Sequence, residues 1–352
     1  MGVGMRVLGL GLGLVGVLAC AAARAQDAGL LSPMDRFHPV VAAHGMVSAQ
    51  ERVAAEVGRD ILKAGGNAVD AAVAVGFALA VTLPRAGNIG GGGFMLVHEA
   101  ASGRTEAIDY RETAPAAASR DMFLGPDGEV VADMSTRSGA ASGVPGTVAG
   151  MKLALDRFGT MGWAEVIAPA IRLAEEGIVV TPDLADSLAA ERETLGRHPA
   201  SARIFLRPDG SPWQVGDRLV QTDLAATLRR IAAEGPDGFY RGEVARRIVA
   251  ALAREGGVMT ADDLAAYRAV LRAPVRGRYR GYEVVAMPPP SSGGVHLIEM
   301  LNVLEGYPIG ALGPGSAQTI HLMAETMRRA YADRAEYLGD PDFVDVPVAA
   351  LT

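Results

Sequence analysis

Four consecutive glycines at positions 90–93 constrain the fold of this chain more than any other sequence feature. They follow a predicted helix over residues 67–82, which is apolar on all sides and is therefore expected to be buried. They precede an apolar run that starts at Phe94 and is typical of a strand. Residues without Cβ let other elements, or a ligand, lie directly against the main chain. We therefore expect close backbone packing in this loop.

The glycine loop does not match a nucleotide-binding motif. A dinucleotide-binding G-x-G-x-x-G segment follows a strand and opens a helix, whereas this loop follows a helix and precedes a strand. The Gly-Lys-Ser/Thr of a phosphate-binding loop is also absent. The net charge is −7, and no stripe of Lys and Arg residues is present. Because nucleic-acid binding requires such a basic patch, no nucleic-acid partner is predicted.

Periodicity and turn signals predict helices mixed with antiparallel strand pairs. A hairpin is expected over residues 94–110, with a turn at 101–103, and a second strand pair at 275–279 and 282–287. Capping residues and glycine stops predict helices over 48–64, 67–82, 163–176, 223–233, 243–254, 261–268, 294–304 and 316–338. This pattern indicates a layered α/β or α+β domain in one region that spans residues 45–352, and α+β is the fold class that we predict.

The first 25 residues have the pattern of a signal peptide. Arg6 provides a positive start, residues 7–19 are apolar, and Ala23-x-Ala25 forms a cleavage site. Residues 26–44 are then expected to form an extended leader of a periplasmic or secreted protein. An alternative is a lipid anchor on Cys20, which is the only cysteine of the chain.

Arg111 is the candidate substrate-binding residue. It lies at the end of the second predicted strand, in the sequence DYRETAP at 109–115. A guanidinium presents a planar pair of donors that matches a carboxylate bidentately. The alternative is an ordinary ion pair of Arg111 with Asp109 or Glu112.

Other candidate segments carry weaker signals. The sequence PPPSSGG at 288–294 leads into a helix, where backbone donors favour an anion, but Ser291 or Ser292 as a helix N-cap is the simpler interpretation. The six histidines share no metal-binding spacing, and one cysteine forms no metal site. No metal and no cofactor is predicted.

Several segments in the same order resemble the γ-glutamyltransferase (glutathione hydrolase) family of bacterial type. They are GGNAVDAA at 65–72, GNIGGGGFM at 87–95, DYRETAP at 109–115, SGVPGT at 142–147, PPPSSGG at 288–294 and AYADR at 330–334. The resemblance implies an N-terminal nucleophile hydrolase fold, a four-layer αββα sandwich that is incomplete in the large subunit alone. It also implies that Arg111 binds the α-carboxylate of the glutamyl group.

The resemblance further implies a precursor that cuts itself into a large and a small subunit, which remain together as a heterodimer. The new N-terminal Thr of the small subunit then transfers the γ-glutamyl group of glutathione to water, an amino acid or a dipeptide. The Thr-Thr-His-like cleavage tract is absent from the 352 residues. We therefore expect the nucleophile beyond Thr352, no catalytic residue in this chain, and no activity from this chain alone.

Two alternatives stay open. One is a related amidase, such as a cephalosporin acylase or an enzyme that processes poly-γ-glutamate. The other is a non-catalytic periplasmic binding or scaffold protein.

Overall fold

The computed structural model describes residues 39–352. The predicted signal peptide at 1–25 and residues 26–38 of the predicted leader lie outside these residues. Residues 39–44 have no regular secondary structure. Within 39–352, no helix is both long and apolar enough to cross a membrane.

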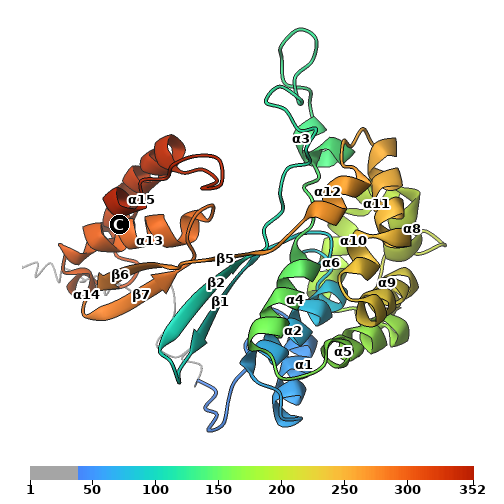
Figure 1. Cartoon of the computed structure of the whole chain (residues 1–352), viewed down its shortest axis with the longest axis horizontal. Helices are drawn as coiled ribbons and strands as arrows, with labels where there is room; N and C mark the ends of the chain where they lie inside the picture. Colours follow the sequence, from blue (N-terminus) through green and yellow to red (C-terminus); the bar gives the residue numbers. More distant parts are fainter. Residues whose placement is uncertain (1–38) are drawn as a thin grey trace, which may run out of the picture.

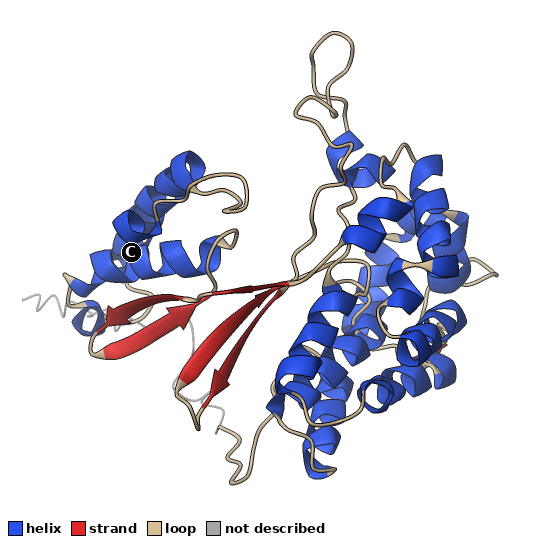
Figure 2. Ribbon diagram, viewed as in Figure 1, coloured by secondary structure: helices blue, strands red, loops and turns tan. Residues whose placement is uncertain are grey.

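The described chain forms two lobes that are joined by a small sheet (Figure 1). Helices dominate both lobes, and all the strands are short (Figure 2), so the predicted α+β class is confirmed. The helical lobe contains α1 (Arg52–Lys63), α2 (Ala68–Thr82), α4 (Thr147–Phe158), α5 (Trp163–Glu176), α6 (Pro182–Ala190), α7 (Arg192–Arg197), α8 (Pro199–Phe205), α9 (Thr222–Glu234), α10 (Asp237–Tyr240), α11 (Gly242–Arg254) and α12 (Ala261–Ala266). The C-terminal lobe contains β6 (Val275–Tyr279), β7 (Tyr282–Ala286), α13 (Ser292–Glu305), α14 (Ile309–Leu312), α15 (Ala317–Tyr337) and α16 (Val348–Leu351).

The sheet between the lobes has the strand order β1–β2–β5 and is antiparallel throughout. Its strands are β1 (Phe94–Glu99), β2 (Arg104–Asp109) and β5 (Val270–Arg272). The predicted hairpin is confirmed, with Phe94 opposite Asp109 in the β1–β2 register. Asp109 in turn lies opposite Val270, so β5 brings a distant chain segment to the end of β2. The other strand pairs are β6–β7 and β3 (Ile178–Val179) with β4 (Arg218–Leu219).

Helix α2 is the centre of the main hydrophobic core, as its apolar composition predicts. Eleven of its 15 residues are buried, and it packs against α1, α5 and α4. Phe77 of α2 is fully buried and meets Trp163 of α5 edge to face, with ring centroids 5.4 Å apart. The C-terminal lobe has a separate small core that includes Val275, Val295 and Ile298.

Some predicted boundaries are wrong. Helix α1 begins at Arg52, because the Glu51 carboxylate accepts the N–H groups of Val53 and Ala54, both at 2.9 Å, and so acts as the N-cap in place of Ser48. Helix α12 ends at Ala266, two residues before its predicted end.

The structure also contains an ion pair and several elements that the sequence patterns did not predict, and it confirms two predicted helix caps. In α15, Arg329 pairs with Glu325, the carboxylate one turn before it. Elements that lie outside the predicted ranges are α3 (Met134–Arg137), α4, α6, α7, α8, α10, α14, α16, β3, β4 and β5. The caps Asn67 and Ser316 are confirmed.

The glycine loop packs its backbone against the segment that carries Arg111. A Cβ on Gly92 would lie 2.8 Å from the Glu112 nitrogen and 3.0 Å from the Arg111 carbonyl carbon. The loop also accepts N–H groups from Gly146 (2.8 Å) and Thr147 (3.0 Å) at the carbonyl of Gly91. The prediction of close backbone approach is therefore confirmed.

We predict that Gly92→Ala destabilises the protein by about 1–3 kcal/mol, because the added methyl group meets main-chain atoms that cannot rotate away. Gly90→Ala is the matched control, since no atom lies within 4 Å of a Cβ at that position. It should change the free energy of unfolding by less than about 1 kcal/mol. Urea unfolding of both variants measures the difference, and equal midpoints would contradict the packing argument.

Candidate functional site

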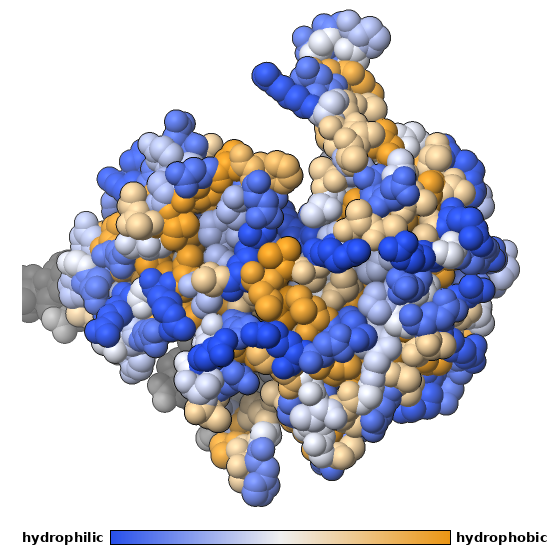
Figure 3. Space-filling view, viewed as in Figure 1, coloured by the Kyte–Doolittle hydropathy of each residue, from blue (hydrophilic) through white to orange (hydrophobic). Residues whose placement is uncertain are grey.

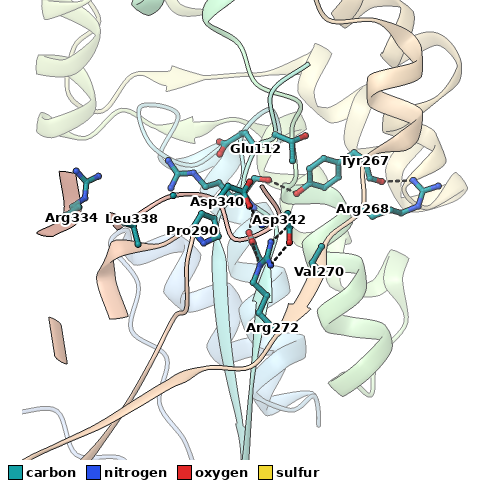
Figure 4. Close-up of a pocket in the computed structure, with 14 residues that line it drawn as sticks. Glu112, Tyr267, Arg268, Val270, Arg272, Pro290, Arg334, Leu338, Asp340 and Asp342 are labelled. Carbon is teal, nitrogen blue, oxygen red and sulfur yellow. Dashed lines mark hydrogen bonds and ion pairs between the residues drawn. The ribbon is translucent and has the colours of Figure 1, made fainter. Parts of the chain in front are cut away.

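A cleft of about 400 Å³ lies where β2, β5 and the end of α15 meet. Four chain segments that are far apart in sequence, at 109–113, 267–272, 290 and 334–342, form its walls (Figure 4). The lining residues are Asp109, Arg111, Glu112, Thr113, Tyr267, Arg268, Val270, Arg272, Pro290, Arg334, Leu338, Gly339, Asp340 and Asp342. Apolar side chains also gather in the middle of the molecular surface, over the sheet that joins the lobes (Figure 3), where Val270 and Leu271 are 39% and 40% exposed.

Arg111 lies two residues after the end of β2 and is exposed to solvent at the cleft. Within residues 39–352, no carboxylate lies within ion-pair distance of its guanidinium. The alternative ion pair with Asp109 or Glu112 is therefore not formed among these residues. An exposed guanidinium without a protein carboxylate retains its planar donors for an incoming carboxylate.

Asp109 pairs with Arg272 of β5 instead. Its Oδ2 lies 2.8 Å from Arg272 Nε, and both side chains are largely buried, at 8% and 15% exposure. The two terminal nitrogens of Arg272 bind Asp342 bidentately, at 3.0 and 2.7 Å. The hydrogen bond to Asp342 raises the pKa of Arg272 more than burial lowers it, and Arg272 in turn lowers the pKa of Asp342. This network, visible in Figure 4, joins the two lobes beside the cleft.

The main chain of Arg111 is held on both sides by side chains. Its N–H donates to Asp109 Oδ1 at 3.0 Å, and its carbonyl accepts the Tyr267 hydroxyl at 2.8 Å. Tyr267 is 7% exposed and stacks on Tyr240, with ring centroids 5.8 Å apart and planes at 8°. Burial raises the pKa of Tyr267 well above its ordinary value, and the nearby groups Tyr240, Asp109 and Glu112 raise it further. The hydroxyl therefore stays protonated and remains a donor.

Two more of the predicted motifs lie beside Arg111. Thr113 and Val144 exchange backbone hydrogen bonds, of 3.3 and 2.8 Å, so the 142–147 segment runs next to 109–115. Pro290 of the 288–294 segment lines the cleft. Ser291 is the N-cap of α13, accepting the Gly293 N–H at 3.1 Å, which confirms the capped-turn interpretation.

The cleft can bind a charged ligand, but its described lining contains no activated nucleophile. Histidine, cysteine and lysine are absent from the lining between residues 39 and 352. Of its two hydroxyls, that of Tyr267 is engaged with Arg111. Cations and the carboxylates of Glu112 and Asp340 both line the space, which suits a zwitterionic ligand. In the same described range, no three His, Cys, Asp or Glu residues are placed to hold a metal ion.

Sequence reasoning missed Tyr267, Arg272 and Asp342. The only signal for β5 is a pair of apolar residues, Val270 and Leu271, before Arg272, and three residues are too few to show strand periodicity.

Comparisons with known proteins give one consistent family. The family model described as gamma-glutamyltranspeptidase matches residues 54–352. The chain is 54% identical to the glutathione hydrolase proenzyme of Escherichia coli (strain K12), over 90% of this chain and 55% of that protein. It is 48% identical to the acylase ACY 1 proenzyme of Pseudomonas sp. (strain V22), over 89% of this chain and 57% of that protein. The chain thus spans about half the length of the curated relatives that it matches.

The same likeness extends to solved structures. The crystal structure of Helicobacter pylori gamma-glutamyltranspeptidase superposes with a TM-score of 0.87 at 47% identity. The match covers 89% of this chain and 90% of that one. Since the family model covers well over half of the chain, and a solved member shares both fold and nearly half of the sequence, this chain belongs to the gamma-glutamyltranspeptidase family.

Proposed function

We propose that the chain is the large-subunit region of a γ-glutamyltransferase, which is also a glutathione hydrolase. In this proposal Arg111 binds the α-carboxylate of a γ-glutamyl donor such as glutathione. The observation that supports it is the exposed Arg111 guanidinium, which has no carboxylate partner in residues 39–352 and lies in a cleft that carboxylates also line. Those carboxylates, Glu112 and Asp340, suit the ammonium group of the same glutamyl moiety.

The nucleophile in this proposal is a threonine of a small subunit made from the same precursor. Several relatives are described as proenzymes, which supports a two-subunit enzyme. The α-amine of an N-terminal Thr takes the proton from its own hydroxyl, and the oxygen attacks the γ-carbonyl. The donor amine leaves with a proton, and the γ-glutamyl ester passes to water, an amino acid or a dipeptide. Neither step requires a cofactor or a metal.

The patterns at 1–25 support a periplasmic or secreted location for this enzyme. Export by this route brings the precursor to a compartment outside the cytoplasm, where the mature heterodimer acts. The choice between cleavage after Ala25 and a lipid anchor on Cys20 stays a prediction. N-terminal sequencing and intact mass of the exported large subunit distinguish a free terminus from a lipid-modified one.

The function is tested with two anilides that differ in one group. The purified product of the complete gene should hydrolyse a γ-glutamyl anilide at least about tenfold faster than the glutaryl anilide, which lacks only the α-amine, because a lost charged contact costs about 1.5–3 kcal/mol. Mass spectrometry should find two fragments of one precursor. A preference for the glutaryl compound would favour the acylase, to which the relative named acylase ACY 1 gives some support. One uncut and inactive chain would favour the scaffold protein.

A further inference from the structure

Arg111 lies in a short irregular stretch after β2. Residues 110–112 belong neither to a helix nor to a strand, although β2 ends immediately before them at Asp109. Tyr110 still exchanges backbone hydrogen bonds with Gly93, of 3.2 and 3.0 Å, and Thr113 exchanges them with Val144, but the N–H and carbonyl of Arg111 take part in neither pair. Side chains from other segments satisfy these two groups instead and fix the geometry in which Arg111 meets a ligand.

We infer that Tyr267 is a positioning residue for Arg111, and that its hydroxyl fixes the backbone from which the substrate-binding guanidinium projects. The inference rests on the proposed function, because it concerns how Arg111 meets a glutamyl carboxylate. The direct observation is the 2.8 Å hydrogen bond from the Tyr267 hydroxyl to the Arg111 carbonyl, between residues 156 positions apart in sequence.

Tyr267 is itself held in one place. Its ring stacks on Tyr240, whose hydroxyl donates to the Pro145 carbonyl at 2.8 Å. The Tyr267 hydroxyl also lies so close to Gly146 that a Cβ at that position would clash with it. A packed ring with no space beside its hydroxyl has little freedom to turn, so it is suited to hold its partner.

Helix α12 ties the same two segments together at a second point. Its N-cap Thr260 accepts the Asp263 N–H, and Asp263 accepts the backbone N–H of Ala116 at 2.8 Å. The segment after Arg111 is therefore attached to the start of α12, while Arg111 itself is attached to the residue after its end. With Asp109 holding the Arg111 N–H, both peptide groups of Arg111 are fixed.

A bidentate contact depends on the orientation of a planar group, and a misplacement of about 1 Å costs much of its effect. Tyr267→Phe keeps the packed ring and removes the one hydrogen bond to Arg111. The readout is the inhibition constant of L-glutamate against a γ-glutamyl anilide, in the enzyme made from the complete gene. We expect this constant to rise about tenfold, with kcat changed less than about threefold, as for the loss of one oriented hydrogen bond.

Tyr240→Phe is the matched control, since it keeps the ring on which Tyr267 stacks and removes only a hydroxyl that bonds to the Pro145 carbonyl and the Ala149 N–H and not to Arg111. It should leave the L-glutamate constant within about twofold of the parent. In an Arg111→Lys background, Tyr267→Phe should cause no further rise, because the two residues act through one contact. An equal effect of the two tyrosine variants, or full additivity with Arg111→Lys, would overturn the inference.

The outcomes separate the inference from the function on which it rests. If Arg111→Lys raises the L-glutamate constant and folded Tyr267→Phe does not, the positioning role is wrong and the proposed function stands. If Arg111→Lys has no effect, both are wrong. Should Tyr267→Phe fail to fold, Asp109→Ala tests the same backbone from its N–H side, because it removes the oxygen that accepts the Arg111 N–H. A folded Asp109→Ala enzyme with the parent constant would also overturn the positioning of Arg111 by its flanking hydrogen bonds.

Discussion

Arg111→Lys is expected to lower kcat/KM for a γ-glutamyl donor by about 30- to 700-fold, which corresponds to about 2–4 kcal/mol of transition-state stabilisation. Lysine keeps the positive charge but presents a single ammonium in place of two parallel donors. The loss therefore measures the bidentate geometry and not the charge. Most of it should appear in KM, because the contact is made to a part of the donor that does not react.

The matched control for this variant lies in the same cleft. Arg334 also lines the cleft, at the far side from Tyr267 in Figure 4, and its guanidinium lies 6.0 Å from the Tyr331 ring. Arg334→Lys should change kcat/KM by less than about threefold, since a surface cation away from the carboxylate contributes little. Equal losses for both variants would mean that the cleft attracts anions in general, and the specific role of Arg111 would be wrong.

Local signals predicted much of the fold. Asn67 and Ser316 each precede a run of helix-forming residues, and each accepts an N–H group of the helix that follows. The hairpin from Phe94 to Asp109 was also predictable, because a turn lies between two runs with strand character. Strand β5 was not, since its three residues acquire strand geometry only by pairing with β2.

Only part of the candidate site was predicted, because sequence signals are local and the site is built from distant segments. Arg111 was found through a contiguous motif, but its surroundings come from remote parts of the chain. Asp109 binds an arginine 163 positions later, and no spacing rule connects the two. From sequence, Arg111 itself was an equally reasonable partner for Asp109. The β2–β5 register decides between them: it places Val270 opposite Asp109 and Arg272 opposite Ala107, on the same face of the sheet, from where Arg272 reaches Asp109 while Arg111 stays at the cleft.

Asp70→Asn is expected to destabilise the protein by about 3 kcal/mol at neutral pH. The Asp70 side chain is fully buried and accepts hydrogen bonds from the N–H groups of Asn67 (2.8 Å), Thr160 (2.8 Å) and Met161 (3.1 Å), and from the Thr160 hydroxyl (2.6 Å). These bonds fasten the start of α2 to the loop before α5. An amide offers one acceptor oxygen and turns two N–H donors towards groups that also donate, so buried donors lose their partner.

Because the Asp70 carboxylate titrates, the loss of stability in Asp70→Asn depends on pH. Burial alone would raise the pKa of Asp70, but the hydrogen bonds from Thr160, Asn67 and Met161 together outweigh it and hold the pKa below its ordinary value. A carboxyl group with a lowered folded-state pKa stabilises the fold above its unfolded pKa, near about 4. That stabilisation is lost as the pH falls through the folded-state pKa. The gap between parent and Asp70→Asn should therefore be constant from about pH 6 to 8 and should shrink below about pH 4.

Urea unfolding at several pH values measures this gap, and Asp60→Asn on α1 is its control. Asp60 is exposed and pairs only with the neighbouring Arg59 among residues 39–352, at 2.9 Å. Its replacement should change the free energy of unfolding by less than about 0.5 kcal/mol at any of these pH values. A gap for Asp70→Asn that stays the same at pH 3 would mean that shape, and not the ionised carboxylate, is what the buried N–H donors require. If Asp70→Asn lowered the free energy of unfolding no more than Asp60→Asn does, the hydrogen bonds of Asp70 would not be what holds α2 in place.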